Sequence, residues 1–134
     1  MKKSDKNVVI GYINVGGMFG FKEDNIIEIN KELWQFIESD SVEVKYLQYV
    51  LFGKLEDDLN IDYSSTIPNA QVSMVVDGVE FCVIRLPKYT KIDNDGKKTF
   101  VKEQLSYKYG EKVISSISND KFELFVKDLL QITK

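Results

Sequence analysis

The clearest hydrophobic pattern in the chain lies on both sides of an Asp-Gly pair. Residues 71–76 and 79–86 are rich in apolar and β-branched side chains, and Asp77-Gly78 separates them. Asp-Gly favours the two-residue type I′ turn, in which both residues take positive φ angles. The sequence therefore predicts a β-hairpin here. Pro87 is expected to end it, because proline cannot donate to the ladder of a central strand.

A second hairpin is predicted directly after the first. Tyr89–Ile92 and Lys97–Val101 bracket residues 93–96, which read Asp-Asn-Asp-Gly and are typical of a turn. The two segments are more polar than those of the first hairpin. We therefore expect this hairpin to be exposed.

A third hairpin is predicted near the start of the chain. Residues 8–13 are β-branched and aromatic, and residues 18–21 could return beside them as a second strand. Gly16 and Gly17 lie between the two segments. Two glycines readily supply the positive φ angles of a tight turn.

Two segments have the period of an amphipathic helix. At the C-terminal end, apolar residues recur at i, i+3, i+4, i+7 and i+8, and Asp120 with Glu123 has the spacing of a capping box. The second segment begins near Asn25 or Asn30 and carries an apolar stripe as far as Ile37. We predict two helices, the earlier one ending near Ser39, although Ile26–Ile29 is also compatible with a short strand.

The region that follows supports two interpretations. Residues 42–46 alternate like a half-buried strand, whereas leucines repeat every four residues from Leu47 to Leu59 and favour a helix. Because Gly53 interrupts the leucine stripe, we predict a strand as far as Phe52, then a polar loop to Asn69. Residues 111–118 are predicted to form either a short helix or an edge strand.

These elements together predict an α+β fold. We expect a mainly antiparallel sheet of about five to six strands built from hairpins, one helix in the N-terminal third and a C-terminal helix packed on the sheet. The length of 134 residues, with 43% hydrophobic and 29% charged residues, fits one globular domain over residues 1–134.

Composition narrows the chemistry that the chain can perform. It contains no histidine and one cysteine, which removes catalytic triads with histidine and thiolate-rich metal sites. Cys82 has apolar neighbours and is predicted to be a buried thiol in a strand. We expect no enzymatic activity and no cofactor.

Charge argues against nucleic acid as a partner. The formal net charge is −3 and the pI is about 5.1, whereas most nucleic-acid binders are basic. Arg85 is the only arginine among 18 basic residues, so the rigid forks that read phosphates and base edges are almost missing. No apolar run approaches the roughly 20 residues that span a bilayer, and the N-terminus lacks signal-peptide features. We expect a cytoplasmic protein.

Three motifs resemble ligand sites but lack essential residues. The glycine-rich stretch over residues 11–20 has Phe21 where a P-loop has lysine, so it is predicted to be a turn, with a ligand-cradling loop as the alternative. In residues 93–96, an EF-hand alignment would put Lys91 and Lys102 at calcium-binding positions, so a turn is predicted there too. The acidic cluster of Glu56, Asp57, Asp58 and Asp62 is predicted to be a solvated loop.

The remaining candidates favour binding over catalysis. Lysines gather in residues 88–112, where they could attract an acidic partner or an anionic ligand, and tyrosines lie beside them. The candidate binding residues are Gly16, Gly17, Tyr89, Lys91, Lys97, Lys98, Tyr107 and Tyr109.

Three functions compete on this evidence. The first is a non-enzymatic interaction protein of the inhibitor, immunity or accessory type, which occludes the surface of another protein. The second is a protein that binds a nucleotide-like anion through the glycine backbone, tyrosines and lysines. The third and weakest is a metal-assisted or carboxylate enzyme built on Asp57, Asp58 and Asp62. Homo-oligomerisation, as in self-assembling phage or mobile-element components, is compatible with the sequence as well.

Overall fold

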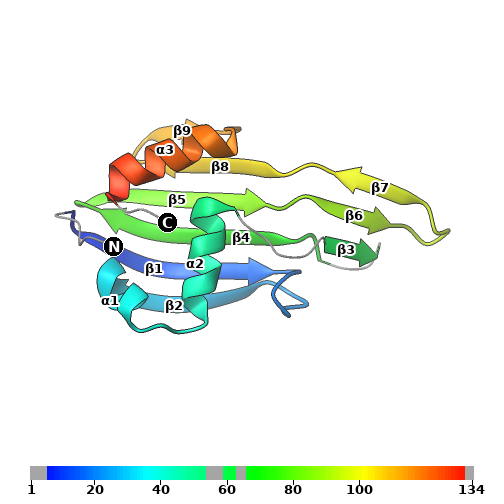
Figure 1. Ribbon diagram of the computed structural model, residues 1–134, viewed down its shortest axis with the longest axis horizontal. Coiled ribbons are helices and arrows are strands. Elements are labelled where there is room, and N and C mark those ends of the chain that lie inside the picture. The colour runs from blue at the N-terminus through cyan, green and yellow to red at the C-terminus, as the bar shows by residue number, and fades with distance from the viewer. Residues whose placement is uncertain (1–5, 54–58, 63–65, 132–134) are drawn as a thin grey trace.

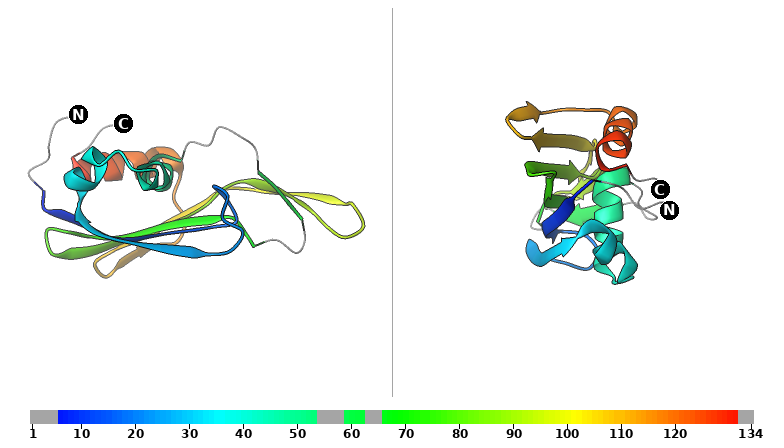
Figure 2. Two further views of the ribbon diagram at one scale, coloured as in Figure 1. Left: turned by 90° about the horizontal axis from the view of Figure 1, so that it is seen from below. Right: turned by 90° about the vertical axis from the view of Figure 1, so that its left-hand side faces the viewer.

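The computed structural model describes residues 6–53, 59–62 and 66–131. It shows an α+β fold in which three helices lie on one face of a six-stranded antiparallel sheet (Figures 1 and 2). The spatial order of the strands is β2-β1-β4-β5-β8-β9. Their bounds are β1 (Val8–Gly16), β2 (Asn25–Glu32), β4 (Asn69–Val76), β5 (Val79–Leu86), β8 (Gln104–Tyr109) and β9 (Lys112–Ile114). The helices are α1 (Leu33–Glu38), α2 (Glu43–Phe52) and α3 (Asn119–Leu130). The predicted fold class is confirmed.

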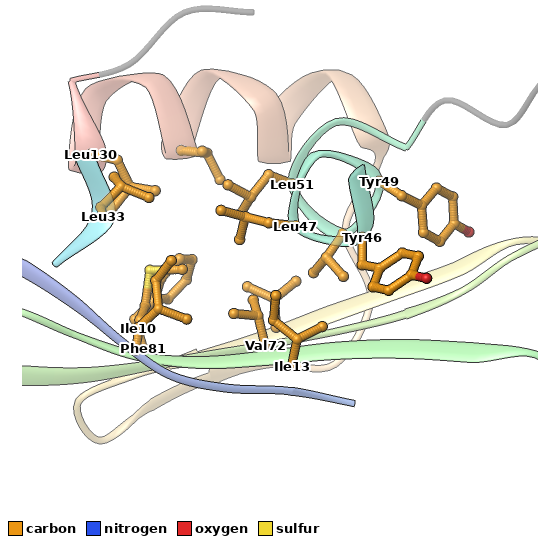
Figure 3. Packing of buried hydrophobic residues seen from close by; sticks show 14 of the residues in the cluster. Ile10, Ile13, Leu33, Tyr46, Leu47, Tyr49, Leu51, Val72, Phe81 and Leu130 are labelled. Atoms are coloured by element: carbon orange, nitrogen blue, oxygen red, sulfur yellow. The ribbon is translucent and has the colours of Figure 1, made fainter. Parts of the chain in front are cut away.

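The hydrophobic core fills the space between the helices and the sheet. Figure 3 shows Leu47 and Leu51 of α2 above Ile10 and Phe81 of the sheet. The sheet supplies its share because every second residue of β4 and β5 points to the helices. Each such aliphatic or aromatic side chain stabilises the fold by about 1.5–3 kcal/mol when fully buried. We call this helix-covered sheet the body.

The hairpin and the helix with the clearest sequence patterns form where the sequence predicts them. Strands β4 and β5 pair across a turn in which Asp77 and Gly78 have φ angles of 47° and 83°, as a type I′ turn requires. Helix α3 is amphipathic, but its N-cap is Ser118, whose hydroxyl accepts a hydrogen bond from the backbone N–H of Lys121 at 3.3 Å. The predicted cap at Asp120 is therefore wrong, and Asp120 lies in the first turn, where its charge favours the helix dipole.

The predicted N-terminal hairpin is wrong in its second strand. Strand β1 pairs with β2, and residues 18–21 form a turn closed by a 3.0 Å hydrogen bond from the Phe21 N–H to the Met18 carbonyl. Positive φ angles at Gly17, Phe19 and Gly20 prevent an extended strand there. The ring of Phe19 instead packs on α2, 5.0 Å from the ring of Tyr46.

The predicted helix near Asn25 is a strand in its first half. Residues 25–32 form β2, so the strand alternative for Ile26–Ile29 is the correct one, and the helix begins only at Leu33. Isoleucines in this segment satisfy both the helical and the strand pattern. Pairing with β1, which precedes β2 across residues 17–24, decides between them.

The predicted strand over residues 42–52 is wrong: this segment is α2. Val44, Leu47 and Leu51 are buried at helical spacing, and Gly53 ends the helix with a left-handed φ of 74°. The glycine that seemed to interrupt the leucine stripe is thus the C-cap. In the predicted polar loop, residues 59–62 form strand β3 (Leu59–Asp62), while residues 56–58 lie outside the described part.

Two further predictions are resolved by the sheet. Residues 112–114 form β9, so the edge-strand alternative for that segment is correct. Cys82 does lie in a strand, but it is only half-buried, because it faces away from the helices beside Ser73 and Glu80. Partial burial raises the pKa of its thiol.

Candidate partner-binding arm

Between β5 and β8 the chain leaves the body and returns as a separate hairpin. Its strands are β6 (Tyr89–Ile92) and β7 (Lys98–Val101), which pair antiparallel, and β3 runs parallel to β6 on the other side. Figure 1 shows this small sheet projecting beyond the end of the helices. We call residues 88–102 the arm. The predicted second hairpin is confirmed.

The tip of the arm is a hydrogen-bonded turn. The Asp93 carboxylate accepts from the backbone N–H groups of Lys97 at 2.8 Å and Asp95 at 3.3 Å, and Gly96 takes a φ of 85°. A hydrogen bond with the Asp95 side chain and the backbone bonds from Lys97 and Asp95 hold the pKa of Asp93 below its usual value. The turn therefore has a defined shape although it is exposed.

The arm is a local concentration of positive charge in an acidic protein. Residues 88–102 contain five lysines and two aspartates, whereas the formal net charge of the chain is −3. All five lysines are exposed: Lys88, Lys91, Lys97, Lys98 and Lys102. A charge excess of this kind on a projecting element accelerates encounters with an acidic surface.

An aromatic ring lies among these lysines. Phe100 is 80% exposed, the highest value among the exposed large hydrophobic residues of the described chain. Lys98 is two positions before it and shares its face of β7, and Lys102 follows directly after the strand. Phe100 is not among the binding residues predicted from the sequence. Its signal is an aromatic residue in a polar hairpin that is itself predicted to be exposed.

The root of the arm is fixed by a buried arginine. Arg85 is fully buried near the end of β5, two residues before Pro87. Its Nε donates to the Val50 carbonyl at 2.9 Å, and its Nη1 donates to Asn119 Oδ1 at 2.9 Å and forms an ion pair with Glu103. These acceptors come from the end of α2, the start of α3 and the segment between arm and β8. One side chain thus joins the arm to both helices.

The surroundings of Arg85 are shaped to admit it. A Cβ atom on Gly53 would collide with Arg85 Nη1 and would lie 2.9 Å from Asn119 Oδ1. The rings of Tyr49 and Phe122 each have their centroid 5.8 Å from Arg85 Cζ, a distance that allows a cation–π interaction. Burial raises the pKa of Tyr49 well above its usual value. This role of Arg85 is not predicted from the sequence, because nothing in its local sequence indicates three distant partners.

The structure brings half of the predicted binding residues together. Tyr89, Lys91, Lys97 and Lys98 lie on the arm, where Tyr89 is half-buried and the three lysines are exposed. Gly16 and Gly17 lie at the end of β1, closely packed: a Cβ on Gly16 would collide with Asp24, and one on Gly17 would lie 2.6 Å from the Thr66 carbonyl oxygen. The lack of space for a Cβ atom explains why both positions are glycine.

The other two predicted tyrosines belong to the core. Tyr107 is 6% exposed and stacks on Phe125 with ring centroids 4.6 Å apart. Tyr109 and Phe81 complete this ring cluster between β5, β8 and α3. The groups that the anion-binding hypothesis combines therefore lie on different elements.

A second charged surface lies along the β2 edge of the body. Residues 23–43 carry seven carboxylates and one lysine, and they form β2, α1 and the start of α2 along one margin of the sheet (Figure 1). We call this surface the acidic margin. Its members are Glu23, Asp24, Glu28, Glu32, Glu38, Asp40 and Glu43.

Further tests for known kinds of site gave no match. In residues 6–53, 59–62 and 66–131, no three Cys, Asp or Glu side chains gather where they could hold a metal ion. No helix in those ranges has the length and apolar character needed to cross a membrane. Comparison with protein-family models, curated proteins and solved structures found no match to this chain.

Proposed function

We propose that this chain is a non-enzymatic intracellular interaction protein of the inhibitor, immunity or accessory type, and that its arm enters and occludes the surface of a partner protein. The observation that carries the proposal is Phe100, 80% exposed on a projecting strand between two lysines. An aromatic ring in water is unfavourable by roughly 1.5–3 kcal/mol relative to a buried one. Docking into an apolar pocket recovers that free energy.

The composition of the arm suits a protein partner. Binding hot spots are commonly aromatic residues surrounded by polar groups that exclude water. The lysines of the arm provide such a surrounding and would also steer the arm to an acidic surface. Their aliphatic stems can cover apolar area while their charges stay in solvent.

Nucleic acid is a poorer fit than protein. Phosphates and base edges are read mainly by guanidinium forks, and the only arginine of the chain is fully buried at the root of the arm. The acidic margin would in addition repel a phosphate backbone. The lysines are therefore better explained by carboxylates on a protein.

The anchoring of the arm supports occlusion by a preformed element. Arg85 connects the arm root to α2 and α3, and Asp93 closes the tip. An element that already has its bound shape loses less conformational entropy when it binds. The arm is thus suited to enter a partner's surface without changing its own shape.

Affinity purification from the protein's own host tests the proposal. The tagged wild type is compared with Phe100→Ala and with Leu124→Ala, which removes a 70% exposed leucine from α3 in the body. A partner is expected to be retained at stoichiometric amounts by wild type and Leu124→Ala and lost with Phe100→Ala. Calorimetry with the purified partner should then show about ten-fold or greater weakening. If Phe100→Ala retains the partner as fully as Leu124→Ala does, the proposed binding through Phe100 of the arm is wrong.

A further inference from the structure

The described part of the chain has four edge strands, β2, β9, β3 and β7, and two of them, β2 and β7, lie beside side chains of opposite charge. Strand β2 is at one edge of the six-stranded sheet, and β7 is at one edge of the small sheet, so each has a partner strand on one side only. Unpaired N–H and C=O groups on an edge strand are a template for a strand from another molecule. The two edges belong to the acidic margin and to the arm, respectively.

The side chains of the two edges are complementary. On β2, Ile26 is 67% exposed and is flanked at two-residue spacing by Asp24 and Glu28. On β7, Phe100 is flanked at the same spacing by Lys98 and Lys102. Two-residue spacing puts Ile26 and Glu28 on one face of β2 and Lys98 and Phe100 on one face of β7, while Asp24 and Lys102 lie one residue beyond the strand ends. Each edge therefore presents the order charge, apolar residue, charge, with opposite signs.

We propose that the β7 edge of one copy pairs with the β2 edge of a second copy, with Phe100 across from Ile26. Both lysines then face carboxylates, whichever direction the strands run, because the two patterns are symmetrical about their apolar residue. Cross-strand pairs of opposite charge and apolar cross-strand pairs both stabilise a sheet. Among the large hydrophobic residues in the described strands, Phe100 and Ile26 are the two most exposed. This contact would bury them against each other.

Charge also disfavours the symmetrical alternatives. Antiparallel pairing of two β7 edges about Phe100 would put Lys98 across from Lys102. Antiparallel pairing of two β2 edges about Ile26 would put Asp24 across from Glu28. Like charges directly opposite one another destabilise a sheet, so between these two edges the head-to-tail contact is the favoured one. Repeated head-to-tail contacts join copies into a chain or a closed ring.

This inference rests on the proposed function, because it gives the arm a partner. A different protein that takes the arm would compete with the second copy for β7. The protein would therefore self-associate only when that other partner is not bound to the arm. Its strength falls with rising salt, since the contact depends on exposed ion pairs.

Light scattering after size-exclusion chromatography tests the contact over a range of concentrations and salt. The wild type is expected to associate with increasing concentration at low ionic strength. The double variants Lys98→Glu/Lys102→Glu and Asp24→Lys/Glu28→Lys should each be monomeric, about ten-fold or more weaker in association. An equimolar mixture of the two should associate again, because every junction then has opposite charges. Lys108→Glu/Lys112→Glu, which changes two exposed lysines on β8 and β9, should behave as wild type.

A second variant protects the test against misfolding. The Asp24 carboxylate accepts a 2.9 Å hydrogen bond from Asn69, so Glu28→Lys alone should also weaken association without disturbing that bond. A monomeric wild type at every concentration, or association that neither double variant changes, would overturn the inference. The proposed function would survive that result if a different partner still required Phe100.

Discussion

The body and the arm of this protein are stabilised in different ways. In the body, alternate residues of β4 and β5 are buried against three helices, and Phe81 is fully buried. In the arm, every residue from Asn94 to Phe100 is exposed, so its shape depends on backbone pairing, the Asp93 turn and the anchor at Arg85. A small isolated ribbon is only marginally stable in water. The comparison shows that buried apolar side chains stabilise the body, while the arm leaves the ring of Phe100 exposed to solvent.

The sharpest test of this comparison removes one phenylalanine from each region. Phe81→Ala is expected to lower the free energy of unfolding by about 3–5 kcal/mol, because it leaves a cavity among packed rings. Phe100→Ala should change it by less than about 0.5 kcal/mol, because the ring is exposed. Urea denaturation followed by circular dichroism measures both. Similar losses in the two variants would mean that the arm ring is part of the folding core.

Removal of the anchor should have the next largest effect. Arg85→Leu deprives the Val50 carbonyl and Asn119 of their donor and leaves Glu103 without its ion pair, so a loss of about 3 kcal/mol is expected. Arg85→Lys keeps the charge but cannot reach all three acceptors. Its free energy of unfolding should therefore lie between those of the wild type and Arg85→Leu. Hydrogen exchange of the arm amides should accelerate in both variants. A loss under about 1 kcal/mol for Arg85→Leu would contradict the anchoring role.

A pair of glycines separates backbone strain from the contact with Arg85. Gly53→Ala should cost about 2 kcal/mol, because the residue has positive φ and the new methyl group would collide with Arg85. Gly96→Ala on the arm tip has a similar φ of 85° but open space around it, so about 1 kcal/mol is expected. The difference between the two unfolding free energies reports the Arg85 contact. No difference would indicate that Gly53 matters only for its φ.

The smallest effect concerns pH and Tyr49. Burial raises the pKa of Tyr49 in the folded state above the value of about 10 in the unfolded chain. The unfolded state therefore loses this proton first, and the contribution of Tyr49 to stability is present below pH 10 and lost as pH rises above it. Denaturation between pH 7 and 11 should show a decline that is shallower in Tyr49→Phe. Parallel declines in both proteins would assign the effect to other groups.

Turn chemistry and sustained periodicity predicted most of what is correct in the fold. Asp77-Gly78 specifies its hairpin locally, and the C-terminal helix repeats its apolar positions over more than two turns. Two of the errors fall in short apolar segments that fit two patterns at once, residues 25–32 and 42–52. There the choice depends on pairing with β1 and on packing against the sheet, which the pattern of the segment itself does not reveal.

The candidate site was predictable to the same extent. The exposed hairpin and its lysines follow from residues 89–101, because polar segments around an Asp-Gly turn are recognisable locally. The role of Arg85 was not predictable, since Val50, Glu103 and Asn119 converge on it from three other elements. Tyr107 illustrates the opposite error: its neighbouring lysine suggests exposure, yet the fold buries its ring against α3.

The register at the root of the arm has a consequence for the evolution of the protein. Leu86 and Gln104 are directly opposite one another on β5 and β8, so the segment between them begins and ends at one cross-strand pair. A segment of this kind can lengthen, shorten or change its sequence while the strands that carry the core keep their alignment. If the arm binds a partner as we propose, changes in its sequence can alter what is bound while the core strands keep their register.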